Sequence, residues 1–281
     1  MGSDPSYIAE RGGEMQPRLI VFTDLDGTLL DHDSYSWRAA KPAMARLGCN
    51  GIPLIFNSSK TAAEISELQS MMGLRGPFIA ENGAAVVIPA GCLGNAEEEV
   101  VHVGRSYEEV VRTILVQRES GAQFRSFDDL SAEQVASLTR LTVTEAARAK
   151  QRLATVPLVW DGTEEELAQF RAALELEGLK LVQGGRFWHA MGTFDKAEGA
   201  RFLLKRYQEH FGEEPIVTIA LGDSPNDQCM LEAADVPVVI RGVNSDQVQL
   251  PSSRHAMRSL KPGPEGWNEC VLNLLFEYGY Q

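Results

Sequence analysis

The sequence has no dense run of lysine and arginine, and its 26 basic residues are outnumbered by 39 acidic ones. The resulting formal net charge of −13 repels the phosphates of nucleic acids and anionic lipid headgroups. Neither nucleic acid nor a membrane is therefore an expected partner. Small anionic substrates stay possible, because local cations and a bound metal can reverse the sign of the field inside a cleft.

Cysteine is also scarce. The four cysteines form no C-x-x-C pair and have no histidine at ligand spacing, which predicts free thiols and no zinc site. They are Cys49, Cys92, Cys229 and Cys270. No apolar run reaches the roughly 18 residues of a membrane span, and residues 1–14 lack the apolar stretch of a secretory signal. These features fit a cytoplasmic protein. Met15 is an alternative start, and we expect residues 1–16 to be a disordered leader.

Short continuous apolar runs predict strands that are buried on both faces, as in a parallel sheet covered by helices. Such runs lie at 19–22, 53–56, 216–221 and 236–240. The second run is followed by Thr61-Ala62-Ala63-Glu64, a capping box that opens a helix. The pattern predicts an α/β fold with a doubly wound, Rossmann-like parallel sheet.

The stretch 90–189 has a different pattern of apolar and polar residues, which predicts amphipathic helices and few buried strands. Reciprocal helix caps are predicted at Ser106, Ser131, Thr142 and Thr163. The acidic triplets here are most simply solvated helix starts. We therefore expect a core of residues 17–89 and 190–281, interrupted by an inserted α+β cap domain of residues 90–189. No pattern specifies an oligomeric state.

Polar clusters follow three of the predicted strands. Because the carboxyl ends of parallel strands line one crevice, these side chains are expected to meet there. The set comprises Asp24, Asp26, Thr28, Ser58, Ser59, Lys60, Asp223, Asn226 and Asp227, with Lys196 arriving from a nearby helix.

Carboxylates gathered at one point resist ionisation unless a cation lies among them. A hard divalent ion resolves this, and Mg²⁺ is the usual partner of phosphate chemistry because it keeps waters and bridges to the substrate. A carboxylate that attacks phosphorus needs charge to be cancelled by the metal, by Lys196, and by Ser58 or backbone N–H groups at the helix opened by Thr61. Asp26 lies two residues beyond Asp24, on the same side in extended geometry, so it can protonate the leaving oxygen and later activate water.

Each of these signals has a plainer alternative when taken alone. An Asp-Gly pair is most often a turn, and D-x-D-G-T also occurs in calcium loops, although no EF-hand glutamate lies at the required offset. Ser58 alone fits a helix start, and Lys196 alone fits a solvated helix lysine. Their order and their placement after strands favour a phosphate-processing site.

The ordered set resembles the motifs of the haloacid dehalogenase-like phosphatase superfamily. The resemblance is carried by Asp24-Leu25-Asp26-Gly27-Thr28, Ser58, Lys196 and Gly222-Asp223-Ser224-Pro225-Asn226-Asp227, with Glu81-Asn82-Gly83 as the turn into a type-two cap. It implies that Asp24 is nucleophile and metal ligand. Asp26 would be the general acid/base whose backbone carbonyl also binds the metal. Asp223 would be a ligand, and Asp227 a ligand or its support.

The same resemblance makes Ser58 the hydroxyl that binds the phosphoryl group and Lys196 the third-motif lysine. Two departures accompany it. The usual Thr-Gly-Arg is here Ser58-Ser59-Lys60, and the usual Lys-Gly is Lys196-Ala197.

Within that superfamily, residues 19–274 are most similar to the mannosyl-3-phosphoglycerate phosphatases. The matching pieces include Ser58-Ser59-Lys60-Thr61, Phe127-Asp128-Asp129-Leu130, Leu138-Thr139-Arg140-Leu141, Gly185-Arg186-Phe187-Trp188-His189 and Gly263-Pro264-Glu265-Gly266-Trp267. The similarity implies hydrolysis of a sugar-glycerate phosphate, with Arg186 and His189 binding its carboxylate or sugar. The plainer alternative is a cap strand with Trp188 in its core. One departure is Arg152-Leu153-Ala154-Thr155-Val156-Pro157, where the family has Glu before the Pro.

Other functions fit the same residues. Another sugar phosphate would suit the same chemistry, and a phosphomutase or phosphotransferase uses the same aspartyl intermediate. A non-catalytic sugar-phosphate sensor would also keep the scaffold. The presence of Asp24, Asp26, Lys196, Asp223 and Asp227 argues for an enzyme.

Overall fold

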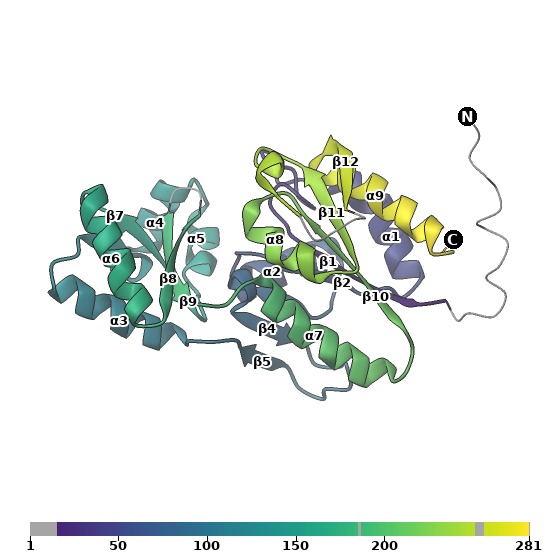
Figure 1. The fold of residues 1–281 in the computed structure, drawn as a ribbon, viewed down its shortest axis with the longest axis horizontal. Helices are drawn as coiled ribbons and strands as arrows, with labels where there is room; N and C mark the ends of the chain where they lie inside the picture. The colour runs from purple at the N-terminus through teal and green to yellow at the C-terminus, as the bar shows by residue number, and fades with distance from the viewer. Residues whose placement is uncertain (1–15, 185–186, 251–255, 281) are drawn as a thin grey trace.

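The computed structural model describes residues 16–184, 187–250 and 256–280. Within these residues the chain forms two lobes, and the larger one is built on a parallel sheet (Figure 1). Among the described helices, none is both long enough and apolar enough to cross a bilayer.

The central sheet has five parallel strands in the order β12-β11-β10-β1-β2. These are β1 (Arg18–Thr23), β2 (Leu54–Phe56), β10 (Ile216–Gly222), β11 (Val236–Arg241) and β12 (Met257–Pro262). The apolar runs predicted as buried strands are confirmed as β1, β2, β10 and β11. Strand β12 has no counterpart among the predictions, because this edge strand is mostly exposed and polar and so lacks a continuous apolar run.

Helices cover both faces of this sheet, because successive strand residues point to opposite sides. The helices of this lobe are α1 (Lys41–Cys49), α2 (Ala62–Met72), α7 (Lys196–Phe211), α8 (Gln228–Ala233) and α9 (Gly263–Glu277). Leu19 and Val21 pack in one cluster with α1 and α9. Ile20 and Phe22 pack in the other with α7 and α8. The predicted doubly wound α/β core is confirmed.

A small antiparallel sheet extends this lobe. Its strands are β3 (Phe78–Ala80), β4 (Ala85–Ile88) and β5 (Glu99–His102). It is joined to the end of β2, where the Ser58 N–H donates to the carbonyl of Ile79 at 3.1 Å. Gly199 lets α7 approach this sheet, since a Cβ there would lie 2.6 Å from Ile79 Cγ2. The 3₁₀ turn Glu81–Gly83 connects β3 to β4.

The smaller lobe is the cap domain, an antiparallel sheet in the order β6-β7-β9-β8. Its elements are α3 (Tyr107–Glu119), β6 (Phe124–Ser126), α4 (Ala132–Thr139), α5 (Val143–Ala149), β7 (Thr155–Trp160), α6 (Glu164–Leu176), β8 (Leu179–Gly184) and β9 (Phe187–Gly192). Helices α3 and α6 share a core with the sheet, and α5 lies against α2 of the larger lobe. The four predicted helix caps are confirmed as capping boxes of α3, α4, α5 and α6.

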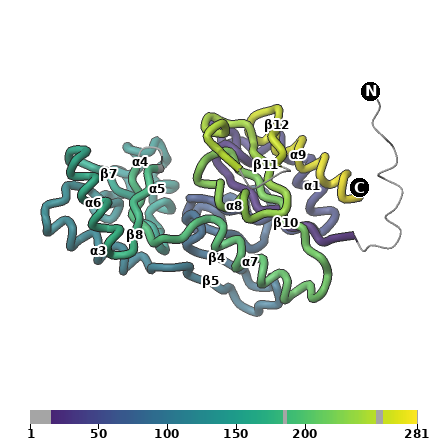
Figure 2. The backbone as a smooth tube through the Cα atoms, viewed as in Figure 1, coloured from purple at the N-terminus to yellow at the C-terminus, as the bar shows by residue number. Residues whose placement is uncertain are grey.

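Two chain segments join the lobes and run side by side (Figure 2). A Cβ on Gly104 of the first segment would lie 2.9 Å from the Phe194 ring of the second. Strand β5 pairs with β4 of the larger lobe, and β9 continues to Gly192. We therefore propose that the cap domain begins near Arg105 and ends near Thr193. It would then begin later than the expected residue 90 and end slightly later than the expected residue 189.

Candidate active site

The register of the parallel strands brings the predicted polar clusters to one edge of the sheet. Thr23 is opposite both Leu221 of β10 and Phe56 of β2, so the residues that follow these strands lie side by side. The Asp24 N–H donates to the carbonyl of Leu221 at 2.9 Å. The Thr23 hydroxyl donates to the Asp24 carbonyl at 2.7 Å and accepts from the indole of Trp267 at 3.0 Å. Trp267 is therefore a core residue that supports this edge.

Lys196, the first residue of α7, is the charged centre of the site. Its Nζ lies 2.5 Å from Asp24 Oδ1 and 2.6 Å from Asp227 Oδ1, and it is 1% exposed. Burial alone would lower the pKa of Lys196, but the charges of Asp227 and Asp24 raise it above its ordinary value. The Asn57 amide donates to the Lys196 carbonyl at 2.9 Å, which fixes the start of the helix. Sequence reasoning missed Asn57, although it directly follows β2.

Asp227 uses both carboxylate oxygens within the protein. Oδ1 accepts from Lys196, and Oδ2 accepts from the N–H groups of Asp223 and Ser224, each at 3.1 Å. Gly222 makes this packing possible, because a Cβ there would lie 2.5 Å from the Asp227 Cβ. The side chain is fully buried and fixed.

The carboxylates of Asp24, Asp223 and Asp227 each have an oxygen within 4.8 Å of the others. Burial, and then the charge of Asp227, raise the pKa of Asp24 to about 8 and that of Asp223 to about 6. The Thr28 hydroxyl donates to Asp223 Oδ1 at 2.9 Å. One ammonium among three carboxylates leaves negative charge uncompensated, and this donor set fits a hard divalent cation.

Two glycines leave room beside the other oxygen of Asp223. A Cβ at Gly27 or at Gly242 would lie 2.7 Å from Asp223 Oδ2. Gly27 also has φ +84°, a conformation that favours glycine. Larger side chains at these positions would displace the carboxylate from the cluster.

Asp26 is held by a different cation from Asp24. Lys60 Nζ lies 2.8 Å from Asp26 Oδ2, and the Asp26 side chain is 41% exposed. The same ammonium lies 5.5 Å from the centre of the Tyr35 ring, which is exposed beside the site. Asp26 is therefore the more solvent-exposed of the two aspartates.

The remaining predicted residues lie in several settings. Ser58 is buried, and its hydroxyl accepts from the Lys60 N–H at 3.3 Å. Asn226 is exposed, and its side-chain oxygen accepts from the Ser224 hydroxyl. Arg186 lies outside the described residues. His189 is on β9, where burial and the charge of Arg152 lower its pKa to about 3.

Arg152 of the cap domain reaches the core. Its guanidinium donates to the carbonyl of Ser59 at 3.2 Å and to the Thr155 hydroxyl at 3.2 Å. Sequence reasoning placed Arg152 only as part of a family pattern. Its contact with the 58–60 loop depends on how the cap domain docks, which the local sequence does not encode.

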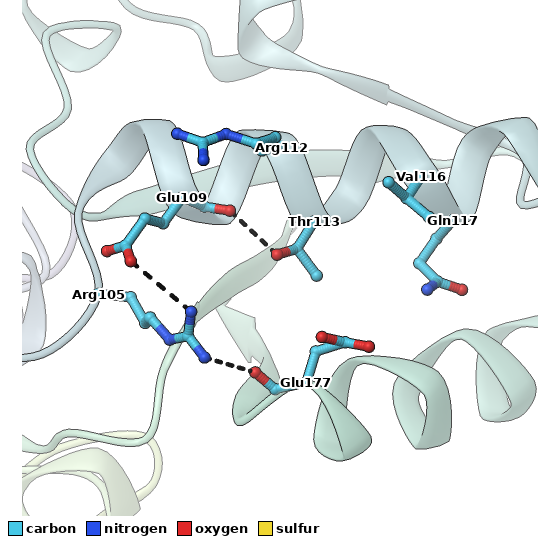
Figure 3. Close-up of a pocket in the computed structure, with 7 residues that line it drawn as sticks. All are labelled: Arg105, Glu109, Arg112, Thr113, Val116, Gln117 and Glu177. Carbon is cyan, nitrogen blue, oxygen red and sulfur yellow. Dashed lines mark hydrogen bonds and ion pairs between the residues drawn. The ribbon is translucent and has the colours of Figure 1, made fainter.

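A separate cleft lies on the cap domain between α3 and the end of α6 (Figure 3). It has a volume of about 260 Å³, and its lining includes Arg105, Glu109 and Arg112. Arg105 is already engaged there, with Glu109 at 3.7 Å and with the carbonyl of Glu177 at 3.1 Å. Neither the acid cluster nor Lys196 lines this cleft.

A doubly wound sheet that ends in a buried aspartate–lysine–aspartate cluster, with a cap domain inserted between its strands β2 and β10, defines the class of haloacid dehalogenase-like phosphatases. The family model of haloacid dehalogenase-like hydrolases matches residues 21–125. A curated relative, the glucosyl-3-phosphoglycerate/mannosyl-3-phosphoglycerate phosphatase of Persephonella marina, is 36% identical over 92% of this chain and 98% of its own. The chain belongs to the haloacid dehalogenase-like hydrolase family, and it is a phosphatase.

Solved structures have the same fold. A phosphatase of this superfamily from Bacteroides thetaiotaomicron has a TM-score of 0.65 and 20% identity, and the match covers 98% of this chain and all of that one. The sucrose-phosphatase of Synechocystis has a TM-score of 0.59 and 14% identity, over 94% of this chain and 99% of that one. The resemblance drawn from the motifs is confirmed.

Proposed function

We propose that the protein is a Mg²⁺-dependent phosphatase that hydrolyses mannosyl-3-phosphoglycerate or glucosyl-3-phosphoglycerate through an aspartyl-phosphate on Asp24. The observation that carries the chemistry is Lys196, fully buried and shared by Asp24 and Asp227. The substrate class is supported by the activity for which the Persephonella marina relative is named and by the near-complete coverage of both chains.

Asp24 is the proposed nucleophile. Lys196 binds Oδ1 and orients the carboxylate, and the second oxygen attacks phosphorus as the bond to the glycerate oxygen breaks. Asp26 donates a proton to the departing oxygen. In the second half, Asp26 takes a proton from water, which attacks phosphorus while the bond to Asp24 breaks. Phosphate leaves, and both aspartates return to their starting states.

The acid cluster is the proposed Mg²⁺ site. Asp24, Asp223 and the main-chain carbonyl of Asp26 would hold the ion, which supplies positive charge to the phosphoryl oxygens when bound. Asp227 supports this site, because both its oxygens are already hydrogen bonded. Thr28 orients Asp223 through its hydroxyl.

Substrate contacts are proposed on both lobes. Ser58, Ser59, Lys60 and Asn226 are the candidates for the phosphoryl group. Neutral His189 and the guanidinium of Arg186 are the candidates for the sugar or the glycerate carboxylate, which would lie under the cap domain.

The test is phosphate release from both glycosyl-3-phosphoglycerates, beside a panel of sugar phosphates and nucleotides. We expect release that EDTA abolishes and added Mg²⁺ restores. Measuring free and transferred phosphate together separates a phosphatase from a phosphotransferase. Turnover of nucleotides but of neither glycosyl-3-phosphoglycerate would refute the proposed substrate.

A further inference from the structure

Glu81 is a buried carboxylate in the turn that follows β3, outside the metal and nucleophile cluster. Its side chain is fully buried, and its φ of +53° lies in the left-handed region that a non-glycine residue seldom adopts. The next residue, Asn82, has φ +59°. Two consecutive residues in this conformation persist only where the surroundings fix them, and such strain is concentrated at functional sites.

The Glu81 side chain is bound by the first residue of the cap domain's β7 and by the two residues that precede this strand. It accepts from the N–H groups of Leu153, Ala154 and Thr155 at 2.6, 3.1 and 2.8 Å, and from the Thr155 hydroxyl at 2.7 Å. Four donors balance the burial of one charge. A core residue thus fixes the start of a cap strand.

The main chain of the same turn holds the 58–60 loop. The Glu81 N–H donates to the carbonyl of Lys60 at 2.9 Å, and the Asn82 N–H donates to the carbonyl of Ser58 at 2.9 Å. Lys60 in turn binds Asp26. A continuous chain of contacts therefore runs from β7 through Glu81 to the proposed phosphoryl-binding loop and the proposed general acid/base.

The turn also touches the segment by which the chain returns to the core. A Cβ on Gly83 would lie 1.9 Å from the carbonyl of Asp195, the residue before Lys196. By contrast, the outer contact between the lobes, Arg148 with Glu67 at 3.4 Å, is partly solvent-exposed. Exposed pairs contribute little and break readily, so of these two contacts the buried one at Glu81 holds the lobes more firmly.

We propose that Glu81 is a positioning residue for substrate selection. By binding the start of β7, it sets the distance between the cap domain and the 58–60 loop. Binding of a substrate that must span from the phosphoryl site to the cap domain depends on this distance, whereas binding of a small phosphate ester does not. The inference rests on the proposed function for the identity of the spanning substrate.

The test variant is Glu81→Gln, which keeps the shape but replaces one acceptor oxygen by an NH₂ group facing N–H donors. For the glycosyl-3-phosphoglycerates we expect kcat/KM to fall by about 10²-fold, mainly through a higher KM, whereas kcat/KM for p-nitrophenyl phosphate changes by less than about threefold. Equal losses with both substrates, or no loss with either, would overturn the proposal.

The matched control is Glu166→Gln. Glu166 accepts from the N–H and hydroxyl of Thr163 at 2.8 and 3.0 Å, a similar set of bonds that lies wholly inside the cap domain. We expect this variant to keep wild-type values for every substrate. If Glu81→Gln fails to fold by circular dichroism, Thr155→Val removes one of the four donors and should produce a smaller loss confined to the glycosyl substrates.

Small-angle X-ray scattering separates failure of this inference from failure of the proposed substrate. Wild-type protein that releases no phosphate from either glycosyl-3-phosphoglycerate refutes the substrate alone. In that case Glu81→Gln should still show a larger radius of gyration than wild type and Glu166→Gln, because the lobes lose their fixed contact. Identical scattering of all three proteins would refute the proposed positioning role of Glu81.

Discussion

The buried ion pairs of the core and the exposed ion pairs of the cap domain differ in how strongly water screens them. In the core, Lys196 and its two aspartates have side chains that are at most 8% exposed. In the cap domain, Arg125 and Asp161 pair at 2.8 Å with side chains 50% and 41% exposed. Water screens the second pair and not the first, so only the core pair can act strongly on a neighbouring reaction centre.

Sheet topology explains why the charges gather in the core. Parallel strands all end at one edge, so the residues after β1, β2 and β10 meet there. In the antiparallel cap sheet, neighbouring strands end at opposite edges, and no comparable convergence is built in. We therefore propose that the core supplies the chemistry and that the cap domain supplies surfaces that a substrate can touch.

The largest expected effect comes from Asp24→Asn in the core. Removing the proposed nucleophile should lower kcat by roughly 10⁴-fold or more and abolish labelling of the protein by radioactive substrate. Asp33→Asn, an exposed change in the loop that follows the same strand, should leave kcat unaltered. Substantial turnover by Asp24→Asn would remove Asp24 from the mechanism.

Lys196→Met should produce the next largest change and affect stability as well. It leaves Asp24 and Asp227 buried without their partner, which costs about 3–5 kcal/mol of unfolding free energy. We also expect kcat to fall by about 10²- to 10³-fold, because the charge that orients the proposed nucleophile is lost. Urea unfolding and steady-state rates measure both effects. Lys205→Met, at an exposed position of the same helix, is the control.

His189, in the cap domain, is expected to make the free energy of unfolding depend on pH. Its pKa in the folded protein is about 3, below the ordinary 6.5, so on acidification the unfolded chain takes up a proton that the folded chain does not. This contribution is fully present above about pH 6.5 and is lost as the pH falls toward 3. His189→Gln should therefore lose less stability than wild type between pH 7 and pH 5 in urea unfolding. The same change at exposed His102 is the control, and equal pH dependence in all three proteins would contradict the assignment.

The smallest effect is expected for Arg125→Met in the cap domain. Its carboxylate partner stays hydrated when the guanidinium is removed, so the urea midpoint and kcat should match wild type. A loss approaching that of Lys196→Met would mean that the cap domain also depends on its ion pairs, and the contrast between the lobes would fail.

Much of the core could be predicted from the sequence, because its signals are local. A buried strand followed by Asp24, and another followed by Asp223, fix both the fold and the edge at which these side chains meet. The pairing of Glu81 with Thr155 could not be predicted in this way. These residues are 74 positions apart, and their contact depends on how the two lobes dock. The Lys60–Asp26 pair likewise needs the loop conformations after β1 and β2.

The close spacing of the two crossings at Gly104 and Phe194 has a consequence for protein engineering. Because the chain leaves and returns at nearly one point, a different cap domain could be exchanged between these positions without disturbing the order of the core strands. Such a graft would have to present three consecutive main-chain N–H groups to Glu81. Without them the Glu81 carboxylate would be left unpaired in the interior. This would destabilise the contact between the core and the new cap domain, and the chimera would not fold well enough for its specificity to be measured.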